Sequence, residues 1–140
     1  MKTHFPDRWP TLIAPDLDAF EQLGRESFNR LPESFRALTG DLVVRVAEFP
    51  EQDALTELEL NSPYELLGLF EGIGLAASGG NAVTGQMPNH IWLFRRPILD
   101  YWADIGEPLG DIVTHVLIHE VGHHFGLSDA DMEAIEAATD

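Results

Sequence analysis

The chain has 140 residues, of which 44% are hydrophobic and none is cysteine, which predicts one globular domain over residues 1–140 without disulfides or thiolate metal sites. Its 24 acidic and 8 basic side chains give a formal charge of −16, which disfavours binding to nucleic-acid phosphates. No apolar run has membrane-spanning length and the first residues lack a signal-peptide core, so we expect a cytoplasmic protein with no membrane partner.

The first half of the chain shows helical and strand patterns separated by proline and glycine. Residues 1–15 contain three prolines and are expected to form an irregular arm. Asp16 is a suitable helix cap and Pro32 a suitable helix stop. The predicted elements are helical segments at 17–31, 33–38 and 52–58, a strand at 42–49 and a helical turn at 62–65.

The second half combines short apolar runs with one long apolar helix. The run at 66–73 does not separate strand from helix by its pattern, and we favour a strand. Pro97 closes a clear strand that precedes it, which is typical of an edge strand. The predicted elements are a mobile loop at 76–89 that could act as a lid, a strand at 90–96, a helical turn at 98–104 and helices at 109–124 and 131–139.

The helix at 109–124 contains the motif His-Glu-x-x-His. His119 and His123 are four residues apart, so they lie one turn apart on the same helix face and can point at a single ion. Glu120 is turned away from them and can act as a general base on a water at that ion. The competing interpretation, two histidines packed in a core, leaves the glutamate unexplained.

A catalytic zinc site normally has three protein ligands and a water, so a third ligand is needed. Gly126 follows His123 by three residues, and Asp129 follows the glycine by three, as does the last histidine of the zinc pattern HExxHxxGxxH. This spacing predicts His119, His123 and Asp129 as the ligands of one zinc ion. Three later acidic residues on the last predicted helix are the alternatives to Asp129: Asp131, Glu133 and Glu136.

Other polar residues near the motif are assigned weaker roles. His115 lies one turn before His119, and we expect it to support a ligand or pack in the core, since it is too far along the helix to share an ion with His123. His124 points a quarter turn from His123 and is expected at the surface. The candidates for stabilising an oxyanion are Arg95, Arg96 and Tyr101, although ion pairing and core packing explain them as well.

The residues at 66–72, 91–99 and 114–129 resemble the small bacterial zincin-like metallopeptidase family that carries the HExxHxxGxxD signature. The resemblance implies an α+β minimal zincin fold, in which a small mixed sheet packs against helices that include the HExxH helix. It carries over His119, His123 and Asp129 as ligands of one Zn²⁺ and Glu120 as the catalytic glutamate. It also implies that an edge strand at 91–96 holds an extended peptide or unfolded protein by strand addition.

The sequence therefore predicts a zinc metallopeptidase in which Glu120 activates a zinc-bound water. The alternative is a domain that binds zinc or a partner on the same scaffold without turnover. It is favoured by the short chain and by the lack of an obvious oxyanion donor after the motif.

Overall fold

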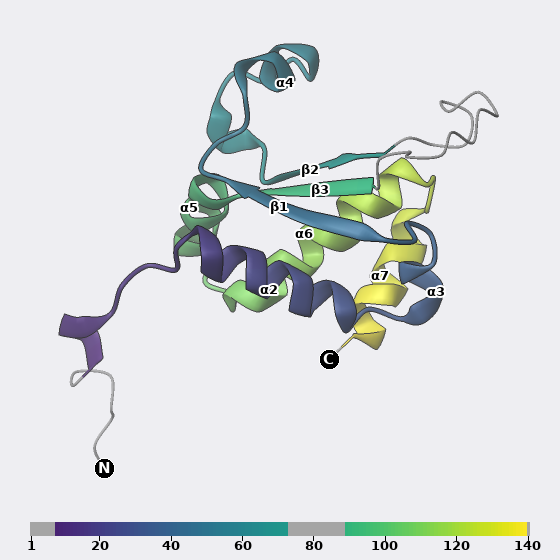
Figure 1. Ribbon diagram of the computed structural model, residues 1–140, viewed down its shortest axis with the longest axis horizontal. Helices are drawn as coiled ribbons and strands as arrows, with labels where there is room; N and C mark the ends of the chain where they lie inside the picture. The colour runs from purple at the N-terminus through teal and green to yellow at the C-terminus, as the bar shows by residue number, and fades with distance from the viewer. Residues whose placement is uncertain (1–7, 73–88, 140) are drawn as a thin grey trace.

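The computed structural model describes residues 8–72 and 89–139. The predicted loop at 76–89 lies outside the described residues except for Asn89, and so do the first seven residues of the predicted arm. Within that arm, Trp9–Thr11 form a 3₁₀ helix, η1, and the chain is irregular from there to Asp16. Figure 1 shows a three-stranded sheet with α2, α6 and α7 on one side and α4 beyond the other.

Most predicted elements are present, with shifted ends. The remaining described elements are α2 (Leu17–Asn29), α3 (Glu33–Arg36), β1 (Leu42–Ala47), α4 (Gln52–Glu57), η2 (Pro63–Glu65), β2 (Gly68–Glu71), β3 (Asn89–Phe94), α5 (Arg95–Ile105), α6 (Leu109–His124) and α7 (Asp129–Ala138). Asp16 caps α2 as expected, because its side chain accepts a hydrogen bond from the Ala19 amide. The ambiguous run at 66–73 contains a strand, as we favoured.

The sheet has the strand order β1-β3-β2 and is mixed. β3 pairs with β1 in parallel, with Val44 opposite Ile91, and with β2 antiparallel, with Phe70 opposite Ile91. The prediction that residues 91–96 form an edge strand is therefore wrong, because β3 is central and its backbone is paired on both sides. Among the described residues, the edges of the sheet are β1 and β2.

The reason for this error is the position of Pro97. The proline lies in the first turn of α5, where a backbone N–H has no helical partner and proline is tolerated. It therefore does not mark a free strand edge. The helical turn predicted at 98–104 is in fact an eleven-residue helix that begins directly after β3, and Gly106, with φ of 75°, ends it.

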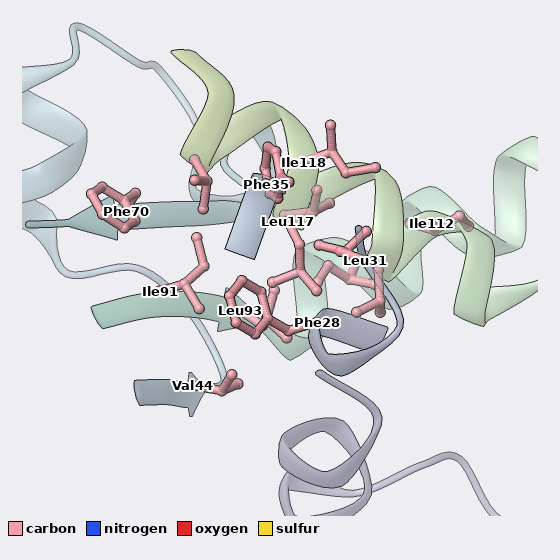
Figure 2. Packing of buried hydrophobic residues seen from close by; sticks show 14 of the residues in the cluster. Phe28, Leu31, Phe35, Val44, Phe70, Ile91, Leu93, Ile112, Leu117 and Ile118 are labelled. Carbon is pink, nitrogen blue, oxygen red and sulfur yellow. The ribbon is translucent and has the colours of Figure 1, made fainter. Parts of the chain in front are cut away.

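The core lies between the sheet and the two helices α2 and α6. Figure 2 shows inward-pointing residues of all three layers in contact, among them Phe28, Val44, Ile91, Leu93 and Leu117. α6 contributes seven buried residues, as its nearly continuous apolar sequence predicts. No helix in the described ranges is long and apolar enough to cross a membrane.

Two glycines allow close approach of the elements around α6. A Cβ added at Gly68 in β2 would lie 2.6 Å from Cγ1 of Val116 and 2.9 Å from the Trp92 carbonyl oxygen. A Cβ added at Gly122 would lie 2.5 Å from Sδ of Met132 in α7. All three distances are shorter than real Cβ contacts, so the two glycines let α6 lie this close to β2 on one side and α7 on the other.

Candidate metal centre and catalytic glutamate

The predicted motif lies in the last two turns of α6. The helix ends in a Schellman motif, in which the Gly126 amide donates to the His123 carbonyl and the Leu127 amide donates to the Gly122 carbonyl. Gly126 has φ of 77°, the left-handed conformation that this motif needs. The chain therefore reverses directly after the histidines and brings α7 back alongside them.

α7 begins two residues earlier than predicted, and Asp129 is its first residue. Ser128 and Asp131 form a capping box at this helix start: Ser128 Oγ accepts from the Asp131 amide at 3.0 Å, and Asp131 Oδ2 accepts from the Ser128 amide at 3.2 Å. This box fixes where α7 starts. It thereby sets the position of every acidic side chain of α7 relative to α6.

The closest polar contacts of the site join α6 to Glu136 of α7. Nδ1 of His115 lies 3.0 and 3.1 Å from the two carboxylate oxygens of Glu136. Nε2 of His119 lies 3.8 Å from Oε1 of the same carboxylate, which is an ion-pair distance but too long for a hydrogen bond. The rings of His115 and His119 stack with centroids 3.9 Å apart. Glu136 was one of the alternatives to Asp129, and it is the one that contacts the histidines.

His115, His119 and Glu136 each offer one donor atom within 4.8 Å of the other two. His123 is less closely associated, with its ring 5.7 Å from that of His119 and nearly perpendicular to it. Asp129 affects His119 only through its charge, and more weakly than Glu136 does. The ligand set His119, His123 and Asp129 therefore stays a prediction, while His115 is half exposed and does not pack in the core.

Burial, and next the neighbouring His115, lower the pKa of His119. The negative charge of Glu136 opposes this shift without reversing it. His119 is therefore neutral at physiological pH. A neutral imidazole keeps the lone pair that a metal ion requires.

Glu120 lies on the other side of the histidines, against the sheet. Its Cγ would be 3.7 Å from a Cβ at Gly68, so its side chain passes beside β2. Burial raises the pKa of Glu120 to about 7. A carboxyl with that pKa exchanges its proton readily near neutral pH, as a general base must.

A cleft of about 500 Å³ opens beside the histidines. Its apolar wall includes Leu67, Ile112 and Val116, and its polar rim carries Glu107 and Glu133 in addition to Glu136. Tyr101 also lines the cleft and is 42% exposed, so core packing does not explain it. The cleft is large enough for an amino-acid side chain and is acidic around His115 and His119.

The two arginines considered as oxyanion donors are engaged elsewhere. Arg95 donates to Glu48 at 2.8 Å and to the Pro15 carbonyl at 2.6 Å, and Arg96 lies over the Phe49 ring. A second hollow, of about 270 Å³, lies on the far face of the sheet beside Phe49 and Trp92, and no histidine lines it. The cleft beside His119 is therefore the one that belongs to the site.

The sequence did not predict that Glu136 contacts His115 and His119. Glu136 is 17 residues beyond His119, and only the start and packing of α7 bring it back to α6. One signal was available: Gly122, in the last turn of a largely apolar helix, indicates that another element approaches closely at that turn. That element is α7, through Met132.

One of two comparisons with known proteins supports this fold. No curated protein matches the chain. A family model described as zincin-like metallopeptidase matches residues 39–139, which include the whole sheet and all helices from α4 to α7. The α+β architecture, a small mixed sheet packed on helices, is that of a minimal zincin-like fold. The chain therefore belongs to the zincin-like metallopeptidase family.

Proposed function

We propose that the protein is a zinc-dependent metallopeptidase that hydrolyses peptide bonds in the cleft beside His119. The observation that carries this proposal is the position of Glu120. Its side chain passes beside Gly68 of the edge strand β2, where it is partly buried, and burial raises its pKa to about 7. A surface glutamate without a catalytic task gains nothing from such a position, because burial of its charge is unfavourable.

The donor set fits zinc. Imidazole and carboxylate ligands are those that Zn²⁺ takes in catalytic sites, and cysteine is absent from the chain. We propose His119 and His123 as two ligands and Asp129 as the third. A bound zinc ion supplies Lewis acidity, which lowers the pKa of water and polarises a carbonyl group.

Glu120 then carries out the proton transfers. Its carboxylate accepts a proton from the attacking water, whose oxygen bonds to the carbonyl carbon of the peptide. The C–N bond breaks, and Glu120 returns the proton to the departing nitrogen. Tyr101 is the remaining candidate for a donor to the developing oxyanion, since it lines the cleft and both arginines are engaged elsewhere.

An extended peptide or unfolded protein would bind by pairing with β2 instead of β3. β2 is the terminal strand on the side of the sheet nearest Glu120, whereas both edges of β3 are occupied. Strand addition uses main-chain hydrogen bonds, so it fits substrates of varied sequence.

Replacement of Glu120 by Gln tests the mechanism. Glutamine keeps the size of the side chain but cannot take a proton, so kcat should fall by about 10²–10⁴-fold. Zinc content, measured by elemental analysis, should not change. Glu57→Gln, in α4 across the sheet, is the matched control and should leave both quantities at the wild-type level. Peptide cleavage by Glu120→Gln at the wild-type rate would refute the mechanism.

The second candidate is a zinc-binding domain without turnover, and one contact favours it. The Glu136 carboxylate lies 3.8 Å from His119, where it could occupy the position that a water needs in a catalytic site. A wild-type protein that holds zinc but cleaves no peptide in a library of unfolded and short substrates would support this candidate.

A further inference from the structure

We propose that His115, His119 and Glu136 form an auxiliary zinc position. It shares His119 with the proposed catalytic position, so zinc cannot occupy both positions at once. The inference starts from the contacts between α6 and α7. Three donor atoms, two from imidazoles and one from a carboxylate, lie within 4.8 Å of one another. Donors around a tetrahedral zinc with bonds of about 2.1 Å are roughly 3.4 Å apart, so a small inward movement of the side chains completes the site.

The elements that hold the three residues are rigid. His115 and His119 lie one turn apart on α6, whose opposite face is buried in the core. Glu136 is placed by the Schellman motif and by the capping box that start α7 after α6, and by the contact of Met132 with Gly122. The three donors are therefore brought together by packing that does not depend on a bound ion.

The surroundings favour a cation. The cleft at this position is lined by Glu107 and Glu133 as well as Glu136, and none of the described residues that line it is Lys or Arg. Water reaches the site, since the His115 side chain is 51% exposed. A divalent ion can therefore enter without rearrangement of the fold, and the local negative charge raises its concentration there.

His119 cannot bind zinc in the auxiliary position and in the catalytic position at the same time. A neutral imidazole has one lone pair, so one ring binds one cation. Zinc on His115, His119 and Glu136 removes His119 from any site that also uses His123 and Asp129. The auxiliary position would then regulate the enzyme by holding the ion away from the catalytic arrangement. This regulatory consequence rests on the proposed function, whereas the binding of zinc by the three residues does not.

The test uses the full chain without a His-tag, stripped of metal and titrated with ZnCl₂. Binding is followed by calorimetry and by elemental analysis after gel filtration. His123→Ala removes only the proposed catalytic position, and this variant should still bind one zinc per chain. Adding Glu136→Gln to His123→Ala should weaken binding by at least about tenfold, the smallest loss expected when a supporting group of a metal site is changed. His119→Ala should bind no zinc at either position.

Glu133→Gln added to His123→Ala is the matched control. Glu133 lies one turn before Glu136 on α7 and lines the same cleft, but among the described residues the hydrogen bond and ion pairs of His115 and His119 go to Glu136. Because Glu133 supplies only local negative charge, its replacement should lower zinc affinity much less than Glu136→Gln does. Equal losses for the two glutamates, or no zinc in His123→Ala, would overturn the auxiliary position. Circular dichroism of each variant identifies any that fail to fold. Because the His115 side chain is half exposed, His115→Ala on the His123→Ala background gives a second test of the same position.

A peptidase assay on the wild-type protein separates the two proposals. In one outcome, the wild type has no peptidase activity, His123→Ala retains zinc, and the further change Glu136→Gln removes it. This result would support the auxiliary position and reject the proposed function. Peptidase activity in the wild type together with no zinc in His123→Ala would do the reverse.

Discussion

The two faces of α6 have opposite physical properties. One face carries Val113, Leu117, Ile118 and Val121, which are fully buried against α2 and the sheet. The other carries the histidines at 115, 119 and 123, which range from half-buried to exposed, and the first two line the cleft. One helix thus serves as the centre of the core and as the wall of the site. The rigidity of the first face is what gives the second a defined geometry.

The largest change in stability is expected on the buried face. Leu117→Ala should lower the free energy of unfolding by about 3 kcal/mol, because the side chain is completely buried and its removal leaves a cavity. Chemical denaturation measures the loss. Leu58→Ala, at a position that is 45% exposed, is the control and should change stability much less. Similar losses at both positions would contradict the contrast between core and surface.

A smaller loss is expected where β2 meets α6. Gly68→Ala places a methyl group 2.6 Å from Val116 and near a backbone carbonyl, so one of the two elements must shift at a cost of about 1–3 kcal/mol. Gly110→Ala is the control, because a Cβ there meets nothing within 4 Å. Alanine in place of that glycine in α6 should stabilise the helix by about 0.5–1 kcal/mol. Thermal unfolding of the two variants should therefore shift in opposite directions.

Ser128→Ala tests how the start of α7 affects both stability and the site. It should lower the free energy of unfolding by about 1 kcal/mol, the usual value of a helix cap. The variant loses the hydrogen bond from the Asp131 amide to Ser128 Oγ, and the first turn of α7 frays. Because α7 also carries Asp129 and Glu136, zinc affinity should fall together with stability. A loss of stability with unchanged zinc affinity would show that the site does not depend on how α7 begins.

The smallest effect is expected in the pH dependence of the metal-free protein. The pKa of Glu120 is raised from 4.5 to about 7 in the folded state, so folding favours its protonated form. Its contribution is fully favourable below pH 4.5 and is lost as the pH rises through about 7. Between pH 5 and 8 the wild type should therefore lose more thermal stability than Glu120→Gln. Equal slopes for the two proteins would show that the carboxyl is not perturbed. Water at this partly exposed position keeps the difference small.

Local signals predicted most of the fold. The caps of α2 and α7, the bounds of α6 and the glycine ends of α5 and α6 follow from short-range chemistry, and the structure shows each of them. The central position of β3 could not be read from its sequence, since pairing partners are set by tertiary packing. Pro97 misled the interpretation because the same residue suits a strand edge and the first turn of a helix.

The site was predictable to the extent that one helix carries it. The spacing of His119, Glu120 and His123 is local, and α6 places Glu120 on the sheet side of the two histidines. The role of α7 depends on the angle between two helices, which the spacing of residues along the chain does not encode. For this reason Glu136 stood among several acidic alternatives, although it is the acidic residue that contacts both His115 and His119.

The central position of β3 has a consequence for how the chain reaches its folded state. β1 and β2 do not pair with each other in the sheet, and each has β3 as its partner. During synthesis, the backbone groups of both strands therefore lack their sheet partner until residues 89–94 have been made. Unpaired strand edges promote association between chains. Nascent fragments that end before residue 89 should consequently aggregate, and the chain should depend on rapid completion, or on a chaperone, until β3 has been made.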